Sequence, residues 1–291
     1  MFSFIRLYSV KNVSIFLFLF ILNLPFGASA GVINLGSAES YIFATANTEN
    51  WGGSLTLGSD AHIFGNVASS NTLRLGDGVI IDGDACASST ISWGTTSVAG
   101  ATDTCIDFTQ LANDISGAAA QAQIFVGRDL GDVSGTSEVF GDGFQSFIIN
   151  DLLLANKDTL TVTGGVDDYF IFNVFGLAKL GSGTNILLQG GVTAENVIFN
   201  FVADPTFHTF ELGGANISGT FLSSGRSFII GDGATLNNSR FYTTQSIIAN
   251  VQDVRFPRNA GPLMSVTEPS TLVIFALGAV GLALRRFKKP Y

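Results

Sequence analysis

The sequence predicts an all-β fold, a right-handed β-helix (solenoid) with one flanking α-helix, together with an N-terminal signal helix and a C-terminal hydrophobic helix. No proline occurs between Pro25 and Pro205, and Gly, Thr, Ser, Asn and Asp separate short runs rich in Phe, Ile, Val and Leu. β-branched and aromatic side chains favour strands, and glycine adopts the positive φ angles that tight corners need. Paired glycines at Gly164-Gly165, Gly190-Gly191 and Gly213-Gly214 are 26 and 23 residues apart, a period typical of one solenoid coil.

Three Gly-Asp-Gly turns and several alternating runs support the same fold. The turns lie at Gly76–Gly78, Gly141–Gly143 and Gly231–Gly233, each next to a strand-like run. Alternation in runs such as 160–163 and 170–174 indicates strands that bury one face. A β-sandwich is the alternative, but its turn signals are expected every 8 to 12 residues or so, with fewer Gly-Asp-Gly corners.

One segment interrupts the strand pattern and predicts an amphipathic helix from Asp107 to Gln123. Asp107 is a suitable N-cap, because its carboxylate accepts a hydrogen bond from a backbone N–H of the first turn. The apolar residues at helical spacing are Phe108, Leu111, Ala112, Ile115 and Ala119. We expect this helix to pack along the solenoid.

The first thirty residues have the pattern of a secretory signal peptide. A weakly basic start precedes the uncharged segment 13–24, and Ala28 and Ala30 supply the small residues that a signal peptidase requires. We therefore expect signal peptidase to cleave after Ala30, which makes Gly31 the mature N-terminus. A permanent anchor is the weaker alternative, because the apolar core falls short of the roughly 20 residues that span a bilayer.

The C-terminal segment also has a signal-like order of features. We expect residues 31–256 to form the solenoid domain, 257–267 a linker, and 268–291 a sorting tail with an apolar segment from Leu272 to Leu284. The tail opens with Glu268, Pro269, Ser270 and Thr271. It ends with the basic residues Arg285, Arg286, Lys288 and Lys289, which the positive-inside rule places on the cytoplasmic side. An ordinary C-terminal transmembrane helix is the alternative.

The tail resembles the PEP-CTERM sorting tail that exosortases recognise in Gram-negative bacteria producing exopolysaccharide. The usual signature of that family is Val-Pro-Glu-Pro-Ser-Thr, and Thr267 stands here in place of its first proline. The resemblance implies an exosortase-like transpeptidase as a partner, with 268–271 as its recognition element and the basic cluster as a stop signal. It also implies at least transient membrane attachment through the tail, and a final place in the cell envelope, on the outer surface or in the extracellular matrix.

A second resemblance covers roughly residues 118–251. The alanine-rich helix that ends in Ala-Gln-Ala-Gln, followed by runs such as 160–165, 169–174 and 196–200, is similar to the ice-binding-protein-like β-solenoid family. One departure is Asn238, which replaces the glycine that follows Leu-Asn in that family. These motifs are mostly apolar and therefore imply a fold more than a function.

Ice binding would require a flat face of regularly spaced threonines on successive coils. Thr159, Thr161 and Thr163 supply one row. The next coil is expected to present Asn185, Leu187 and Gln189 instead. Threonine is also common on outward strand positions for reasons of β-propensity alone.

Charge and cysteine content limit the partners. Residues 31–268 include 8 basic and 23 acidic residues, a formal charge of −15. This charge excludes nucleic acid and anionic membrane surfaces as partners, because both require a basic face. It is compatible with exopolysaccharide or another surface glycan as a partner. Cys86 and Cys105 are expected to form a disulfide in an oxidising compartment.

No catalytic or metal site is assigned from the sequence, and no cofactor. His62 and His208 are far apart and belong to no zinc or Ser-His-Asp motif. A carbohydrate-active enzyme on a β-helix would use clustered carboxylates. The candidates are Asp77, Asp82, Asp84, Asp167 and Asp168. Aspartate beside glycine is more often a turn residue. Ca²⁺ binding by the oxygens of the same aspartates is an alternative, although no EF-hand loop or calcium nonapeptide is present.

The function that the sequence favours is therefore non-catalytic. We expect an exported surface or extracellular-matrix protein, structural or adhesive, that is sorted by an exosortase and associated with exopolysaccharide. An ice- or carbohydrate-surface-binding protein is the alternative, and a carbohydrate-active enzyme is the third possibility.

Overall fold

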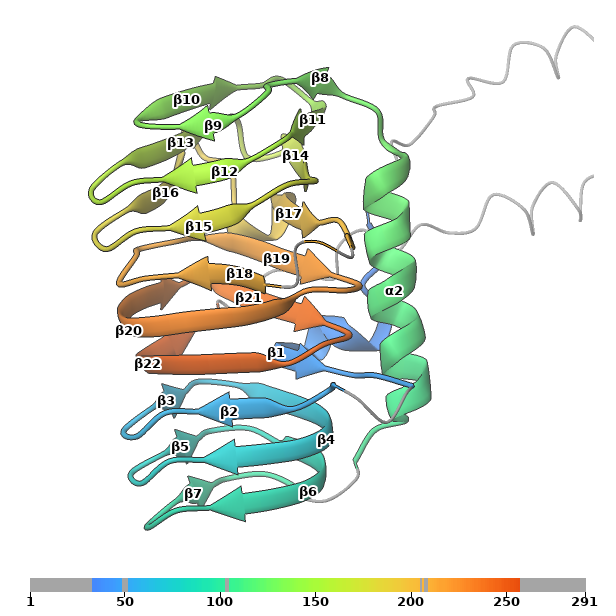
Figure 1. Ribbon diagram of the computed structural model, residues 1–291. Coiled ribbons are helices and arrows are strands. Elements are labelled where there is room, and N and C mark those ends of the chain that lie inside the picture. The colour runs from blue at the N-terminus through green and yellow to red at the C-terminus, as the bar shows by residue number, and fades with distance from the viewer. Residues whose placement is uncertain (1–32, 49–51, 103–104, 205, 207–208, 257–291) are drawn as a thin grey trace, which may run out of the picture. The chain divides into compact units, whose positions relative to one another are not determined.

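The computed structural model describes residues 33–48, 52–102, 105–204, 206 and 209–256. These residues form a stack of coils, and each strand pairs with the equivalent strand of the coil above and the coil below (Figure 1). Every strand pairing in this part of the chain is parallel. This confirms the predicted β-helix over a sandwich of antiparallel sheets. The predicted signal helix and C-terminal hydrophobic helix lie outside the described residues.

Each coil contributes strands to three faces. The first, which we call the helix face, contains β8 (Arg128–Asp129), β11 (Phe144–Ile149), β14 (Tyr169–Val174), β17 (Val197–Phe201), β19 (Gly219–Ser223), β21 (Ser239–Thr243), β1 (Tyr41–Thr45) and the first parts of β4 (Asn66–Leu75) and β6 (Ala85–Ser92). The second face contains β9 (Val133–Ser134), β12 (Leu152–Leu154), β15 (Ala178–Leu180), β18 (Thr209–Leu212), the first parts of β20 (Ser227–Asn237) and β22 (Ile247–Arg255), β2 (Leu55–Leu57) and the ends of β4 and β6.

The third face completes the coil. It contains β10 (Ser137–Phe140), β13 (Thr159–Thr163), β16 (Asn185–Gln189), the ends of β20 and β22, β3 (His62–Ile63), β5 (Ile80–Ile81) and β7 (Ser97–Val98). Two short 3-10 helices, η1 (Gly36–Ser40) and η2 (Ala194–Asn196), flank the strands of the helix face.

The coils are not stacked in sequence order. The chain begins in the middle of the stack at β1 and descends to β7, and α2 (Phe108–Ile124) then runs along the side to the other end (Figure 1). From β8 the coils descend again until β21 and β22 pair with β1, β2 and β3. At this junction the Tyr242 hydroxyl donates a hydrogen bond to the Tyr41 carbonyl at 2.8 Å. Burial raises the pKa of Tyr242 to about 12, which keeps this donor protonated.

A column of six phenylalanine rings lies under the helix face. Adjacent rings in the column are stacked, with centroids 4.7 to 5.7 Å apart. The members in spatial order are Phe147, Phe172, Phe199, Phe221, Phe241 and Phe43, all at most 1% exposed. The guanidinium of Arg128 covers the end of the column, 5.2 Å from the centroid of Phe147. Six successive coils thus place a phenylalanine at the same register, and the stacked rings hold these neighbouring coils together.

Helix α2 matches its predicted position and cap. The carboxylate of Asp107 accepts hydrogen bonds from the N–H groups of Thr109 and Gln110, as the sequence indicated. The buried face consists of Leu111, Ala112, Ile115, Ala118, Ala119 and Ala122. Because a 17-residue helix is about 25 Å long and coils repeat about every 4.8 Å, α2 can cross about five coils. It contacts β14, β17, β19 and β21.

Two buried asparagines fasten α2 to the helix face. The Asn173 amide donates to the Ala122 carbonyl at 2.8 Å, and the Asn200 amide donates to the Ala119 carbonyl at 3.1 Å. The same Asn200 nitrogen also bonds the Asn173 side-chain oxygen at 2.8 Å. Alanine on the facing helix surface leaves room for this close approach, and the buried amides would otherwise lack partners.

The spacing of the glycine pairs predicts the coil length correctly for the first interval but not for the second. Gly164 and Gly190 do lie on adjacent coils, because they follow the paired residues Thr163 and Gln189. The N–H of Gly213, in contrast, donates to the Leu180 carbonyl at 2.8 Å, at a different corner. The interval of 23 residues between the second and third glycine pairs is therefore not a coil length. Coil lengths vary because the corners hold different numbers of residues.

The predicted disulfide lies in the terminal coil that contains β6 and β7. Cys86 in β6 is bonded to Cys105, with 5.3 Å between their Cα atoms. In this coil, polar residues occupy positions that are apolar in the neighbouring coil. Thr90 and Ser92 are exposed and pair with the buried residues Leu73 and Leu75. A terminal coil has no neighbour to cover it, so hydroxyl side chains at these positions limit the apolar surface in contact with water.

We expect the double substitution Cys86→Ala and Cys105→Ala to lower the free energy of unfolding by about 3 kcal/mol, because the disulfide restricts a loop of about 20 residues in the unfolded chain. Urea denaturation of the oxidised protein measures the effect, and wild-type protein treated with reductant is the matched control. Equal unfolding midpoints for the variant and the oxidised wild type would contradict the prediction.

Candidate functional site

The carboxylates considered for catalysis link the corners of neighbouring coils. One oxygen of Asp77 accepts a hydrogen bond from the N–H of Thr95 at 2.7 Å, and one oxygen of Asp84 accepts from the N–H of Ala101 at 2.9 Å. In each case the donor belongs to the following coil. These contacts support the turn interpretation of both aspartates, because each side chain satisfies a backbone donor at a corner.

Two further candidates are engaged in similar ways. Asp168 accepts hydrogen bonds from the N–H groups of Gly143 and Gly165 with its two oxygens. Asp82 lies 3.1 Å from the Nε2 atom of His62 and forms a surface pair with it. Asp167 is exposed, and His208 lies outside the described residues. Within the described ranges, no three His, Cys, Asp or Glu side chains are grouped to hold a metal ion.

The threonine row of β13 does not extend to the neighbouring coils. Thr161 pairs with Glu138 on one side and Leu187 on the other, and Thr163 pairs with Phe140 and Gln189. Thr159 pairs with Asn185, as the sequence predicted. The sheet that carries the row consists of β10, β13 and β16. Its outward side chains are therefore mixed in charge, size and polarity, and the threonines form no face that repeats from coil to coil.

A row of buried hydroxyls marks the corner where the helix face ends. Each of these hydroxyls donates a hydrogen bond to a backbone carbonyl, at 2.6 to 2.8 Å. The four residues, which we call the corner hydroxyls, are Ser223, Thr243, Thr45 and Ser69, and they are in register on successive coils. They satisfy carbonyls that face the interior where the chain turns.

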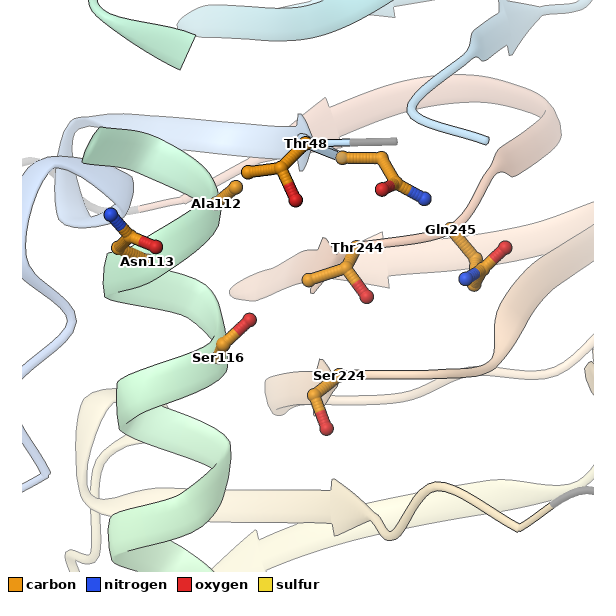
Figure 2. A pocket seen from close by; sticks show the side chains of 8 residues that line it. Thr48, Ala112, Asn113, Ser116, Ser224, Thr244 and Gln245 are labelled. Carbon is orange, nitrogen blue, oxygen red and sulfur yellow. The ribbon is translucent and has the colours of Figure 1, made fainter. Parts of the chain in front are cut away.

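A polar pocket lies directly outside this corner, between α2 and the turns that follow β1, β19 and β21 (Figure 2). Its volume is about 230 Å³. It is lined by Asn47, Thr48, Ala112, Asn113, Ser116, Ser224, Thr244 and Gln245. No charged side chain is among them, and seven of the eight carry a hydroxyl or an amide. We call this cavity the helix pocket.

Sequence reasoning did not find the helix pocket. Its residues come from segments around positions 47, 113, 224 and 244, which only the interrupted order of the coils brings together. Ser, Thr, Asn and Gln at corners are ordinary turn residues. No local pattern therefore separates these side chains from their neighbours.

The sequence signals for processing lie outside the described residues. They are Ala28, Ala30 and Gly31 at the expected cleavage site, Glu268, Pro269, Ser270 and Thr271 in the motif, and Arg285, Arg286, Lys288 and Lys289 in the basic cluster. In the part of the chain that the structure describes, no helix has both the length and the apolar character to cross a membrane.

The C-terminal tail matches a known family of sorting motifs. Residues 265–288 match the model of the PEP-CTERM protein-sorting motif. This motif implies processing by an exosortase and export to the cell surface of a Gram-negative bacterium. No functionally curated protein matches the chain in sequence.

The solenoid domain is similar in fold to solved structures of ice-binding proteins. An ice-binding protein from an Antarctic bacterium of the Flavobacteriaceae has a TM-score of 0.56 and 19% identity, over 77% of this chain and 47% of its own. A glycosylated ice-binding protein from an Arctic yeast has a TM-score of 0.55 and 18% identity, over 79% and 96%. One from an Antarctic Biological Consortium has a TM-score of 0.53 and 17% identity, over 77% and 90%.

These likenesses define a class of protein. At such low identity they show the fold alone, which is the β-helix of the ice-binding proteins. The chain is therefore a β-helix protein with a PEP-CTERM sorting motif at its C-terminus, as both resemblances in the sequence predicted.

Proposed function

We propose that this is a non-catalytic surface or extracellular-matrix protein, structural or adhesive, that an exosortase sorts and that associates with exopolysaccharide. The observation that carries the proposal is the sorting motif at 265–288, which follows the solenoid directly. A motif of this kind delivers the domain that precedes it to the surface, so the solenoid is the part that acts there.

The side chains of the solenoid support a non-catalytic role. The carboxylates of Asp77, Asp84 and Asp168 bond backbone N–H groups at corners, and that of Asp82 pairs with His62. A rigid stack with stacked phenylalanines and a terminal disulfide suits a protein whose task is to persist outside the cell. Its formal charge of −15 keeps it soluble and away from anionic surfaces.

Replacing Glu268 and Pro269 by alanine is expected to block removal of the tail without unfolding the solenoid, because the motif lies beyond the last strand. Mass spectrometry of both termini, on protein from a host with an exosortase, measures processing, and circular dichroism measures folding. Arg258→Ala, in the predicted linker, is the matched control and should be processed normally.

The same experiment also tests the association with exopolysaccharide. The wild-type protein should fractionate with the matrix of a host that makes exopolysaccharide and pass into the medium of a host that does not. Normal cleavage of the double variant would overturn the sorting role, and residues 272–284 would then be a membrane anchor.

A second candidate function is binding to an ice or carbohydrate surface. The fold shared with ice-binding proteins favours it, whereas the mixed neighbours of Thr159, Thr161 and Thr163 do not. Thermal hysteresis of the mature protein in solution would support ice binding in place of the structural role.

A further inference from the structure

We propose that the helix pocket binds one neutral sugar residue of an exopolysaccharide chain. This inference rests on the proposed function and assigns the site through which the protein contacts the glycan. Three properties of the pocket carry it: hydroxyls and an amide that make no hydrogen bond within the described residues, the absence of charge on its lining, and its position at an open corner.

Four side chains that line the pocket make no hydrogen bond within the described part of the chain, whereas the corner hydroxyls beside them do. Thr244 is only 9% exposed, and its hydroxyl makes no hydrogen bond within the described part of the chain. The side chains of Ser116, Ser224 and Gln245 likewise make none there, although their positions line the same cavity. Thr244 is buried, Ser224 and Gln245 are half-buried and Ser116 is exposed. Their hydroxyls and amide face one cavity and can bond a polar ligand that enters it.

The adjacent corner hydroxyls provide an internal comparison. Thr243 and Ser223 immediately precede Thr244 and Ser224, and both donate to carbonyls of the protein at 2.8 Å or less. The fold therefore uses one hydroxyl of each pair for its own backbone and leaves the next one facing the pocket. The first hydroxyl of each pair bonds the protein's own backbone, whereas the second makes no hydrogen bond to the residues that the structure describes.

The chemistry of the lining matches a neutral sugar. Hydroxyl and amide side chains both donate and accept hydrogen bonds, as sugar hydroxyls do. A uronate or phosphate group would need a cationic partner such as Arg or Lys, and none lines the pocket. The formal charge of −15 on the body also repels acidic glycans. An uncharged sugar residue is thus favoured over an acidic one.

The shape of the site suits one residue of a longer chain. Figure 2 shows Ser116 directed from α2 toward the turn that carries Thr244, with Thr48 and Ser224 on either side of that turn. The pocket therefore has a helical wall and a wall made of coil corners. An opening of this kind admits one ring while the rest of the glycan continues along the surface.

Calorimetric titration of the mature protein tests the proposal. The probes are neutral trisaccharides of glucose, galactose, mannose and N-acetylglucosamine, with trigalacturonic acid as the acidic counterpart. At least one neutral probe should bind, and more tightly than the acidic one. Thr244→Val should weaken binding by about 2- to 12-fold, the range expected for one lost hydrogen bond.

Two further variants separate binding from folding. Ser116→Ala lies on the exposed side of α2, keeps a good helix former and should also weaken binding. Thr161→Val on the third face is the matched control and should bind like the wild type. Absence of binding to all four neutral probes, preference for the acidic probe, or unchanged affinity in both pocket variants would each overturn the assignment.

The outcome can be distinguished from that of the proposed function. If no neutral probe binds but the mature protein still fractionates with exopolysaccharide, the pocket assignment fails and the surface role stands. If a neutral probe binds in the pocket but the protein does not fractionate with the exopolysaccharide matrix, the proposed matrix association is wrong and the sugar site is still supported.

Discussion

Replacing Phe199 by alanine is expected to lower the free energy of unfolding by about 3 to 5 kcal/mol, because a fully buried ring is lost and a cavity remains. Phe199 lies in the middle of the phenylalanine column, with Phe172 at 4.7 Å and Phe221 at 5.3 Å between centroids. The cost includes stacking on both sides, which adds to the burial of the ring itself. Urea denaturation followed by circular dichroism measures the change.

Phe140→Ala is the matched control for the column. This ring lies on the third face and is 62% exposed, so its removal should change the free energy of unfolding by less than about 0.5 kcal/mol. A loss at position 199 no greater than that at position 140 would show that the column does not hold the coils together.

Arg226→Met is expected to lower the free energy of unfolding by about 3 to 5 kcal/mol, because the buried guanidinium satisfies carbonyls on two other coils. Its Nε donates to the Val202 carbonyl at 2.8 Å, and its two terminal nitrogens donate to the carbonyls of Gly176 and Phe175, each at 2.5 Å. Methionine fills a similar space but removes the donor from all three carbonyls, of which that of Val202 is buried and the other two are partly buried.

The electrostatic setting of Arg226 agrees with this role. Desolvation by burial lowers the pKa of Arg226, and the nearby carboxylate of Asp204 acts in the opposite direction. Arg74→Met on β4 is the matched control, since among the described residues the Arg74 guanidinium makes no hydrogen bond or ion pair with another coil, and the variant should unfold near the wild-type midpoint. Equal effects at positions 226 and 74 would contradict the prediction.

Features encoded within a short stretch of sequence were predictable. The N-cap at Asp107 and the apolar spacing that follows it depend on neighbours within a few residues. The position, cap and buried face of the helix could therefore be predicted from the sequence. The alternation in 159–163 likewise defines which side chains point outward from β13. Strand chemistry with glycine corners also distinguished a solenoid from a sandwich.

Features that depend on distant segments were not predictable. The glycine pair at 213–214 resembles the two before it but belongs to another corner, because stacking and not spacing decides which corner a residue occupies. The hydroxyls of Thr243 and Thr244 are equivalent in sequence, yet one bonds a carbonyl and the other faces a cavity formed with α2. Only the three-dimensional arrangement separates their roles.

The interrupted order of the coils imposes a condition on folding after export. The first strand, β1, pairs with β21, and the bond from Tyr242 to Tyr41 joins residues 201 positions apart. The edge of the segment from β1 to β7 that pairs with β21 and β22 therefore stays unpaired until β21 and β22 have been exported. Contacts of such long sequence separation slow folding and leave intermediates prone to aggregation.

The final coil, β21 and β22, is the segment nearest to the sorting motif in sequence. Because β1 and β21 belong to one chain, pairing between them is intramolecular and competes well against pairing with other chains. The stack is therefore completed only by the segment that precedes the sorting motif in sequence.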